Sequence, residues 1–113
     1  MQRHDITALS GDTFSGVQFT VYVNGEILDL TGSVISMQVR KTRLTAPIID
    51  ITTASGMGIT ITDADAGQFT IDEQVFDETP GLYSYDIQIE FLDGRVKTYI
   101  GGEFNLVEDV THD

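Results

Sequence analysis

The fold is decided between residues 80 and 104, where the chain reads PGLYSYDIQIEFLDGRVKTYIGGEF. Apolar and polar side chains alternate through residues 83–91, which is the period of a β-strand with one buried face. The pair Asp93-Gly94 then ends the alternation, and Asp-Gly between two alternating runs is a strong signal for a two-residue turn. The stretch therefore predicts an antiparallel β-hairpin.

The register of this hairpin follows by counting outward from a two-residue turn at 93–94. The count predicts the pairs Leu92 with Arg95, Phe91 with Val96, Glu90 with Lys97, Ile87 with Ile100 and Tyr83 with Phe104. Apolar partners then share one face of the hairpin, and the charged pair lies on the other. The predicted register is therefore self-consistent.

A second hairpin is predicted around Asn24-Gly25. The preceding residues 17–23 alternate, and all four of their odd-numbered positions are apolar. A two-residue turn at 24–25 pairs Val21 with Leu28 and Phe19 with Leu30, which again places apolar side chains together.

The rest of the chain reads as further short strands, over residues 34–40, 48–53, 57–62 and 68–72. Ile35, Met37 and Val39 are expected to face inward. The only helical candidate is residues 73–79, which Pro80 would end because a residue before proline avoids the helical region. Short strands at this spacing predict an all-β fold, an antiparallel β-sandwich or barrel of about seven to eight strands.

Composition excludes several function classes. The chain has 113 residues, no cysteine, and 18 acidic against 6 basic side chains, which give a formal charge of −12. One domain is expected, residues 13–107, with an N-terminal arm over residues 1–12 and a polar tail over residues 108–113; these ends are either extended arms that contact a neighbour or frayed ends. The charge disfavours binding to nucleic acid or an anionic membrane, and disulfides, thiolate catalysis and cysteine-bound zinc are excluded.

Catalytic residues are scarce, and the chain is predicted not to be an enzyme. His4 and His112 lie near the chain ends, where a general base is difficult to hold in place. Asp86 and Glu90 share the outward face of one predicted strand, but four residues of strand separate them by roughly 13 Å, too far for the usual pair of glycosidase carboxylates. No catalytic residue and no cofactor is predicted.

A weak metal-site candidate follows the predicted strand at residues 57–62. Asp63 and Asp65 stand one residue apart beside a glycine, and Asp72 follows the next strand. These carboxylates are of the kind that calcium binds. The alternative is an ordinary turn, because aspartate side chains readily accept hydrogen bonds from nearby backbone amides.

Basic residues gather at one place, and three of the six fall at Arg40, Lys41 and Arg43. This cluster could dock an acidic partner surface, or it could be a solvated loop that keeps a sheet edge from pairing. With Gln2, Arg3 and Ile6 of the N-terminal arm, these residues are the predicted partner-binding set. The arm would act by adding a strand to a neighbour's sheet, which deletion of residues 1–8 would test.

Several segments in this order resemble small virion proteins of tailed bacteriophages. They are Gly11 to Phe14, Leu28 to Gly32 followed by residues 34–40, Ala66 to Ile71, and Pro80 to Ile89. The chain is similar to the N-terminal domain of the baseplate upper protein family, although no receptor-binding extension follows Glu108.

This resemblance implies an immunoglobulin-like β-sandwich and a non-enzymatic structural role in the virion. The protein would be made in the bacterial host cytoplasm and would join other phage structural proteins in the tail or baseplate, with homo-oligomerisation left open. A capsid decoration or head-fibre anchor protein is the alternative within this class. The alternative of another class is a calcium- or carbohydrate-binding adhesion sandwich that uses Tyr22, Tyr99 and the aspartates named above.

Overall fold

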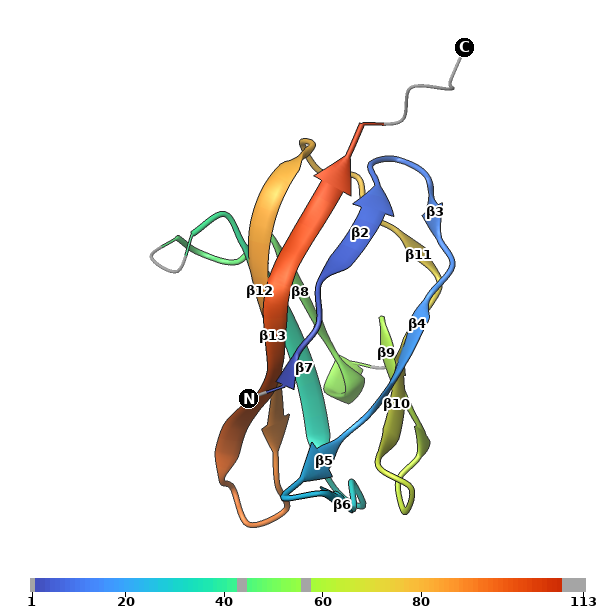
Figure 1. Ribbon diagram of the computed structural model, residues 1–113, viewed down its shortest axis with the longest axis vertical. Coiled ribbons are helices and arrows are strands. Elements are labelled where there is room, and N and C mark those ends of the chain that lie inside the picture. The colour runs from blue at the N-terminus through green and yellow to red at the C-terminus, as the bar shows by residue number, and fades with distance from the viewer. Residues whose placement is uncertain (1, 43–44, 56–57, 109–113) are drawn as a thin grey trace.

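The computed structural model describes residues 2–42, 45–55 and 58–108 of the chain. Two layers of β-strands pack against each other in an immunoglobulin-like sandwich (Figure 1). The described residues include no α-helix and one short 3₁₀ turn, Thr53–Ser55, and no helix among them is long and apolar enough to cross a membrane. Eight of the strands are at least four residues long, so the predicted fold class is confirmed.

The larger layer is a six-stranded sheet, with the N-terminal strands at one edge and β8 at the other. Its order is β1-β13-β12-β7-β8, and β2 also pairs with β13. Its strands are β1 (Gln2–Arg3), β2 (Ile6–Leu9), β7 (Val34–Arg40), β8 (Ile49–Thr52), β12 (Gly81–Glu90) and β13 (Val96–Val107). Neighbouring strands are antiparallel except that β1 and β2 run parallel to β13.

The second layer is smaller and is built around β4 (Val17–Thr20), β10 (Gln68–Ile71) and β9 (Ile59–Asp63), in that order. A two-stranded ribbon lies at each end of this layer in Figure 1. One ribbon joins β3 (Thr13–Phe14) to β11 (Gln74–Val75), and the other joins β5 (Tyr22–Val23) to β6 (Glu26–Ile27).

Alternate residues of both layers fill the core, as the period of the sequence predicts. Ile35, Met37 and Val39 of β7 are fully buried, and so are Ile87 and Ile89 of β12. The Tyr83 ring is also buried, and its hydroxyl donates a hydrogen bond to the Thr79 carbonyl. A tyrosine at the start of a strand that bonds back to the preceding chain is a feature of immunoglobulin-like sandwiches, where it fixes the corner before the strand.

The β12–β13 hairpin forms, but its turn differs from the prediction. Ile87 pairs with Ile100 and Tyr83 pairs with Phe104, as predicted. Near the turn, however, Glu90 pairs with Val96 and Ile89 with Lys97, so the predicted Phe91–Val96 and Glu90–Lys97 pairs are wrong. The register shifts by one residue between Ile87 and Gln88, where Tyr99 is the extra residue of the partner strand.

The cause is a three-residue loop, Leu92 to Gly94, in place of a two-residue turn. The Phe91 amide donates to the Arg95 carbonyl at 2.8 Å, and only Gly94 of the loop has a positive φ, +93°. A two-residue type I′ turn needs a positive φ at both positions, and Asp93 does not adopt one. Its carboxylate instead accepts a hydrogen bond from the Arg95 amide at 3.0 Å, which stabilises the longer loop.

The predicted turn at Asn24-Gly25 is confirmed, because both residues have positive φ, 53° and 80°. The Leu28 amide donates to the Val21 carbonyl, so this predicted pair is also correct. The predicted pairing of Phe19 with Leu30 is wrong. Phe19 pairs with Phe69 of β10 instead, because the chain leaves β4 after Thr20 and β5 belongs to a different sheet.

The predicted helix at 73–79 is absent. Gln74 and Val75 form β11 against β3, and the Phe76 ring packs against Phe14 and Phe104. Seven residues are too few to hold a helix on their own, so packing decides the conformation of this segment.

The N-terminal segment lies in the sandwich and does not extend away from it. Ile6 and Ala8 of β2 are buried in the core, each with 5% of its surface exposed. The domain therefore takes in residues that the sequence analysis assigned to an arm.

Candidate functional site

The candidate site lies where the N-terminal segment crosses β13. Between β1 and β2 the chain bends at His4 and Asp5, and these two residues lie against Gly102. A Cβ atom built on Gly102 would lie 2.5 Å from the His4 carbonyl oxygen and 2.7 Å from an Asp5 carboxylate oxygen. The glycine is therefore required for the two segments to approach this closely.

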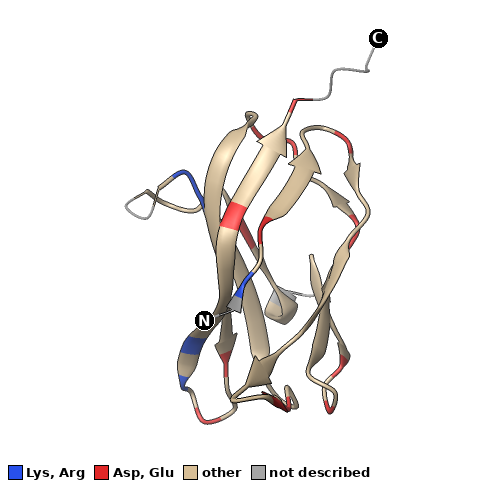
Figure 2. Ribbon diagram, viewed as in Figure 1, with Lys and Arg blue, Asp and Glu red and all other residues tan. Residues whose placement is uncertain are grey.

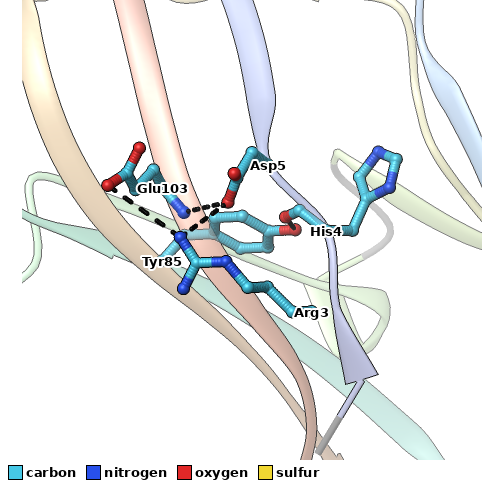
Figure 3. Close-up of polar contacts among 5 residues, drawn as sticks. All are labelled: Arg3, His4, Asp5, Tyr85 and Glu103. Carbon is cyan, nitrogen blue, oxygen red and sulfur yellow. Dashed lines mark hydrogen bonds and ion pairs between the residues drawn. The ribbon is translucent and has the colours of Figure 1, made fainter.

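Tyr85 holds this crossing from the neighbouring strand. It pairs with Gly102 across β12 and β13, and its hydroxyl donates a hydrogen bond to the His4 carbonyl. Figure 3 shows the tyrosine ring crossing β13 to reach that carbonyl. Burial raises the pKa of Tyr85, and the Asp5 carboxylate raises it further, so the hydroxyl stays a hydrogen-bond donor at neutral pH.

Arg3 lies between two carboxylates at the same crossing (Figure 3). Its guanidinium is 3.2 Å from Asp5 and 3.9 Å from Glu103, while the Asp5 carboxylate also accepts the Glu103 amide at 2.9 Å. The Arg3 side chain is 62% exposed, so these ion pairs contribute little to stability. Their main effect is to fix where the positive charge lies.

This cluster forms one wall of a hollow in the six-stranded sheet, which we call the sheet-face hollow. It encloses about 540 Å³, within the range of pockets that hold small molecules. Its lining residues are Arg3, Gln38, Arg40, Ser84, Tyr85, Asp86, Thr98, Gly101, Gly102 and Glu103.

One row of paired residues crosses the sheet through the hollow. Asp50 of β8 pairs with Gln38, Gln38 with Asp86, Asp86 with Gly101, and Gly101 with Arg3. Directly paired residues point to the same side of a sheet, so this row places its side chains on one face. Gly101 contributes no side chain to this row.

Asp86 is unusual in this row, because its Oδ1 atom is shielded from solvent and has no hydrogen-bond partner in the described structure. Its neighbour on β13 is a glycine. Its neighbour on β7, Gln38, is engaged elsewhere, because the side-chain amide donates to Asp50 at 3.5 Å and accepts from Arg40. Neither flank therefore supplies a donor to Asp86.

Positive charge in the described chain is confined to the six-stranded sheet and its loops, whereas acidic residues are spread over the whole molecule (Figure 2). Arg40, which lines the hollow opposite Arg3, donates to the Thr45 carbonyl at 3.0 Å and to the Gln38 side chain. Both arginines of the hollow are thus held by acceptors of the chain itself.

The predicted partner-binding residues are only partly brought together. Arg3 and Arg40 line the same hollow, and Lys41 is exposed just beyond β7. Gln2 pairs with Ile100 in β1, and Arg43 lies outside the described residues. Ile6 is a core residue with 5% of its surface exposed, so its side chain is not part of this surface.

The two histidines of the sequence analysis do not form a site together. The exposed His4 ring packs edge-on against Phe19, with ring centroids 5.1 Å apart, and His112 lies outside the described residues.

The predicted calcium ligands do not converge among the described residues, where no three acidic, histidine or cysteine side chains form a group able to hold a metal. Asp63 accepts the Ala66 amide at 3.2 Å, as expected of a turn, while Asp72 accepts the Thr60 hydroxyl and Asp65 lies in the turn between β9 and β10.

The two tyrosines proposed for sugar binding lie in different sheets. Tyr99 packs edge-on against Phe91, with ring centroids 6.1 Å apart, while Tyr22 lies on the separate β5–β6 ribbon with 54% of its surface exposed.

Sequence reasoning did not find the hollow. It considered Asp86 only as a catalytic partner for Glu90, and it did not single out Gln38, Ser84, Thr98 or Glu103. One signal was available, because aspartate is depleted in strands and Asp86 lies in the middle of a strongly alternating run. The five-strand row itself depends on the parallel pairing of β1, which no local pattern indicated.

Comparison with known proteins gives little beyond the fold. No protein-family model matches the chain, and no curated protein matches it. Among solved structures, the chain is similar to CopC from Methylosinus trichosporium OB3b, with a TM-score of 0.48 and 12% sequence identity over 96% of this chain and 89% of that chain. A likeness at this level carries no argument about function.

The predicted function in a bacteriophage virion is withdrawn, because no family model and no curated protein matches the chain, and the solved structure named above is CopC. The motifs behind the prediction have structural roles. Asp29 accepts hydrogen bonds from the Thr31 amide and hydroxyl in a turn, and the segment after Pro80 begins β12. They indicate a β-sandwich and do not identify its function.

Proposed function

We propose that the protein is a non-catalytic binding module whose ligand site is the sheet-face hollow. The observation that carries the proposal is the shielded Oδ1 atom of Asp86, which lacks a hydrogen-bond partner among the described residues. Most buried polar atoms in folded proteins have a partner from the protein or from ordered water. A ligand that supplies a donor would give this oxygen the partner that the described residues do not.

The hollow has the rigidity that a preformed site requires. Its lining residues come from β1, β7, β12 and β13, and almost all of them belong to paired strands. Sites built on strands hold their geometry better than sites built on loops. The Arg3 and Arg40 side chains are positioned in turn by Asp5, Glu103, Gln38 and the Thr45 carbonyl.

Binding fits this set of side chains better than catalysis does. The lining contains no histidine or cysteine, and Glu103 is already engaged by Arg3. Ser84 and Asp86 lie two residues apart on one strand, and no hydrogen bond joins their side chains in the described structure. The nucleophile and base pair that an acyl-transfer site requires is therefore not assembled in the lining.

The test is a fragment titration followed by amide chemical shifts. Small cationic, anionic and neutral fragments are added in turn to ¹⁵N-labelled protein. We expect at least one class to shift the amides of Asp86, Thr98 and Gly101 together, while amides of the distant β5–β6 ribbon stay fixed. A Gly101→Val variant, which adds a side chain to a residue of the lining, should weaken those shifts. If no class shifts the hollow amides, the proposal fails.

A further inference from the structure

Resting on the proposed function, we infer that the hollow binds a cationic nitrogen group, a guanidinium or an ammonium, which pairs with the Asp86 carboxylate. The inference starts from which charged groups in the hollow already have partners. Arg3 is paired with Asp5 and Glu103, and Arg40 donates to the Thr45 carbonyl and the Gln38 side chain. Both positive charges are therefore engaged within the chain.

Asp86 is the charged group of the hollow that is left over. The ion pairs of the described structure join Arg3 to Asp5, Arg3 to Glu103 and Arg95 to Asp93, so none of them involves Asp86. Its cross-strand neighbours are Gly101, which has no side chain, and Gln38, which is turned toward Asp50 and Arg40. A partner for Oδ1 would therefore come from outside the described residues.

A cation suits this acceptor better than a neutral donor. A carboxylate oxygen shielded from water loses solvation that a single neutral hydrogen bond replaces only in part, whereas a charge-assisted bond is roughly twice as strong. The carboxylate can turn to meet such a group, because the terminal torsion of aspartate has a broad energy minimum. The hollow, at about 540 Å³, also holds far more than a single water molecule.

The charge of the whole chain favours the same class of ligand. A formal charge of −12 attracts cations and repels anions. An anionic ligand would also meet the Asp5 and Glu103 carboxylates that face Arg3.

The test compares two ligands that differ in charge and hardly in shape. Nα-acetyl-arginine methylamide and its citrulline counterpart are titrated into the intact chain at low salt, and binding is followed by calorimetry and by the Gly101 amide shift. We expect the arginine compound to bind about tenfold more tightly than the citrulline compound, and added salt to weaken it. The affinities of free arginine and agmatine are then measured in the same way. Tighter binding of the blocked compound points to an arginine side chain of a peptide, and tighter binding of arginine or agmatine points to a free amino acid or amine.

Two variants locate the effect. Asp86→Asn should weaken binding of the arginine compound about tenfold or more. Glu90→Gln is the matched control, because Glu90 is exposed on the same strand but lies outside the lining, and it should change binding less than about twofold. Equal binding of the citrulline compound, or unchanged binding by Asp86→Asn, would overturn the inference.

The outcome also separates this inference from the proposed function. If neutral or anionic fragments shift the hollow amides while arginine, agmatine and the blocked arginine compound do not, the hollow is a site but its ligand is not a cation. If no fragment of any class shifts those amides, both proposals fail.

Discussion

Two consecutive glycines of β13 differ in what lies beside them. The space beside Gly102 is filled by the chain itself, because His4 and Asp5 lie against it and Tyr85 bonds to the His4 carbonyl. Gly101 lines the sheet-face hollow beside Asp86, whose Oδ1 atom has no hydrogen-bond partner in the described structure.

This difference separates residues that stabilise the fold from residues that are free to bind. A space that the chain fills contributes packing and hydrogen bonds to the folded state. A space that the chain leaves open contributes little to stability, and an unpartnered charge beside it lowers stability. Substitutions of Gly102 and Tyr85 at the N-terminal crossing should therefore change the free energy of unfolding, and substitution of Asp86 should change binding.

The largest expected effect is that of Gly102→Ala. The new Cβ would lie 2.5 Å from the His4 carbonyl, which is backbone and cannot move without shifting the N-terminal crossing. We expect a loss of about 2 kcal/mol in the free energy of unfolding, measured in urea. Gly81→Ala is the matched control, because its Cβ would meet nothing closer than 3.8 Å. Equal stability of the two variants would contradict the close approach at Gly102.

A smaller effect is expected from Tyr85→Phe, which removes the hydrogen bond to the His4 carbonyl. The loss should be about 1 kcal/mol, the usual contribution of one such bond. The His4 amide, which donates to the Gly101 carbonyl at 3.0 Å, should also exchange faster with solvent. Tyr83→Phe, which removes the bond to Thr79 instead, should leave that amide protected. If both variants expose the His4 amide equally, Tyr85 does not hold the crossing specifically.

The smallest effect concerns the hairpin loop, which lies at the end of the strands and outside both glycine sites. The Arg95 backbone amide holds the pKa of Asp93 below its ordinary value of 3.8. A carboxyl with a lowered folded-state pKa stabilises the fold above its unfolded pKa, and this contribution is lost as the pH falls through the folded-state pKa. The urea midpoint of Asp93→Asn should therefore fall less than that of the unaltered chain between neutral pH and a pH well below 3.8. Equal slopes would show that Asp93 makes no such contribution.

The sequence predicts most of the residues that fill the core and few of those that line the hollow. Alternation alone places Ile35, Met37, Val39 and Ile87 in the core, because burial on one face leaves a period of two in the chain. The Asn24-Gly25 turn is also predictable, since asparagine adopts positive φ more readily than most residues. At Asp93-Gly94 the prediction was one residue short. The Asp93 carboxylate accepts a hydrogen bond from the Arg95 amide, and this contact stabilises a three-residue loop.

The N-terminal strands and the hollow could not be predicted in this way. The pairing of β2 with β13 joins residues nearly 100 positions apart and runs parallel, so no turn fixes its register. The hollow depends on the parallel pairing of β1 with β13, which brings Arg3 into its lining. Local sequence patterns predict the strands, whereas the hollow is formed by contacts between strands that are distant in the sequence.

The central claim is that Asp86 is a binding residue and not a folding residue, and one variant tests it directly. For Asp86→Asn, the free energy of unfolding and the affinity for Nα-acetyl-arginine methylamide are measured on the same preparation. We predict a stability equal to that of the unaltered chain within about 0.5 kcal/mol, or slightly higher, because an unpartnered charge is removed. The affinity should fall about tenfold or more. A variant that loses about 2 kcal/mol of stability and still binds the arginine compound normally would contradict the account.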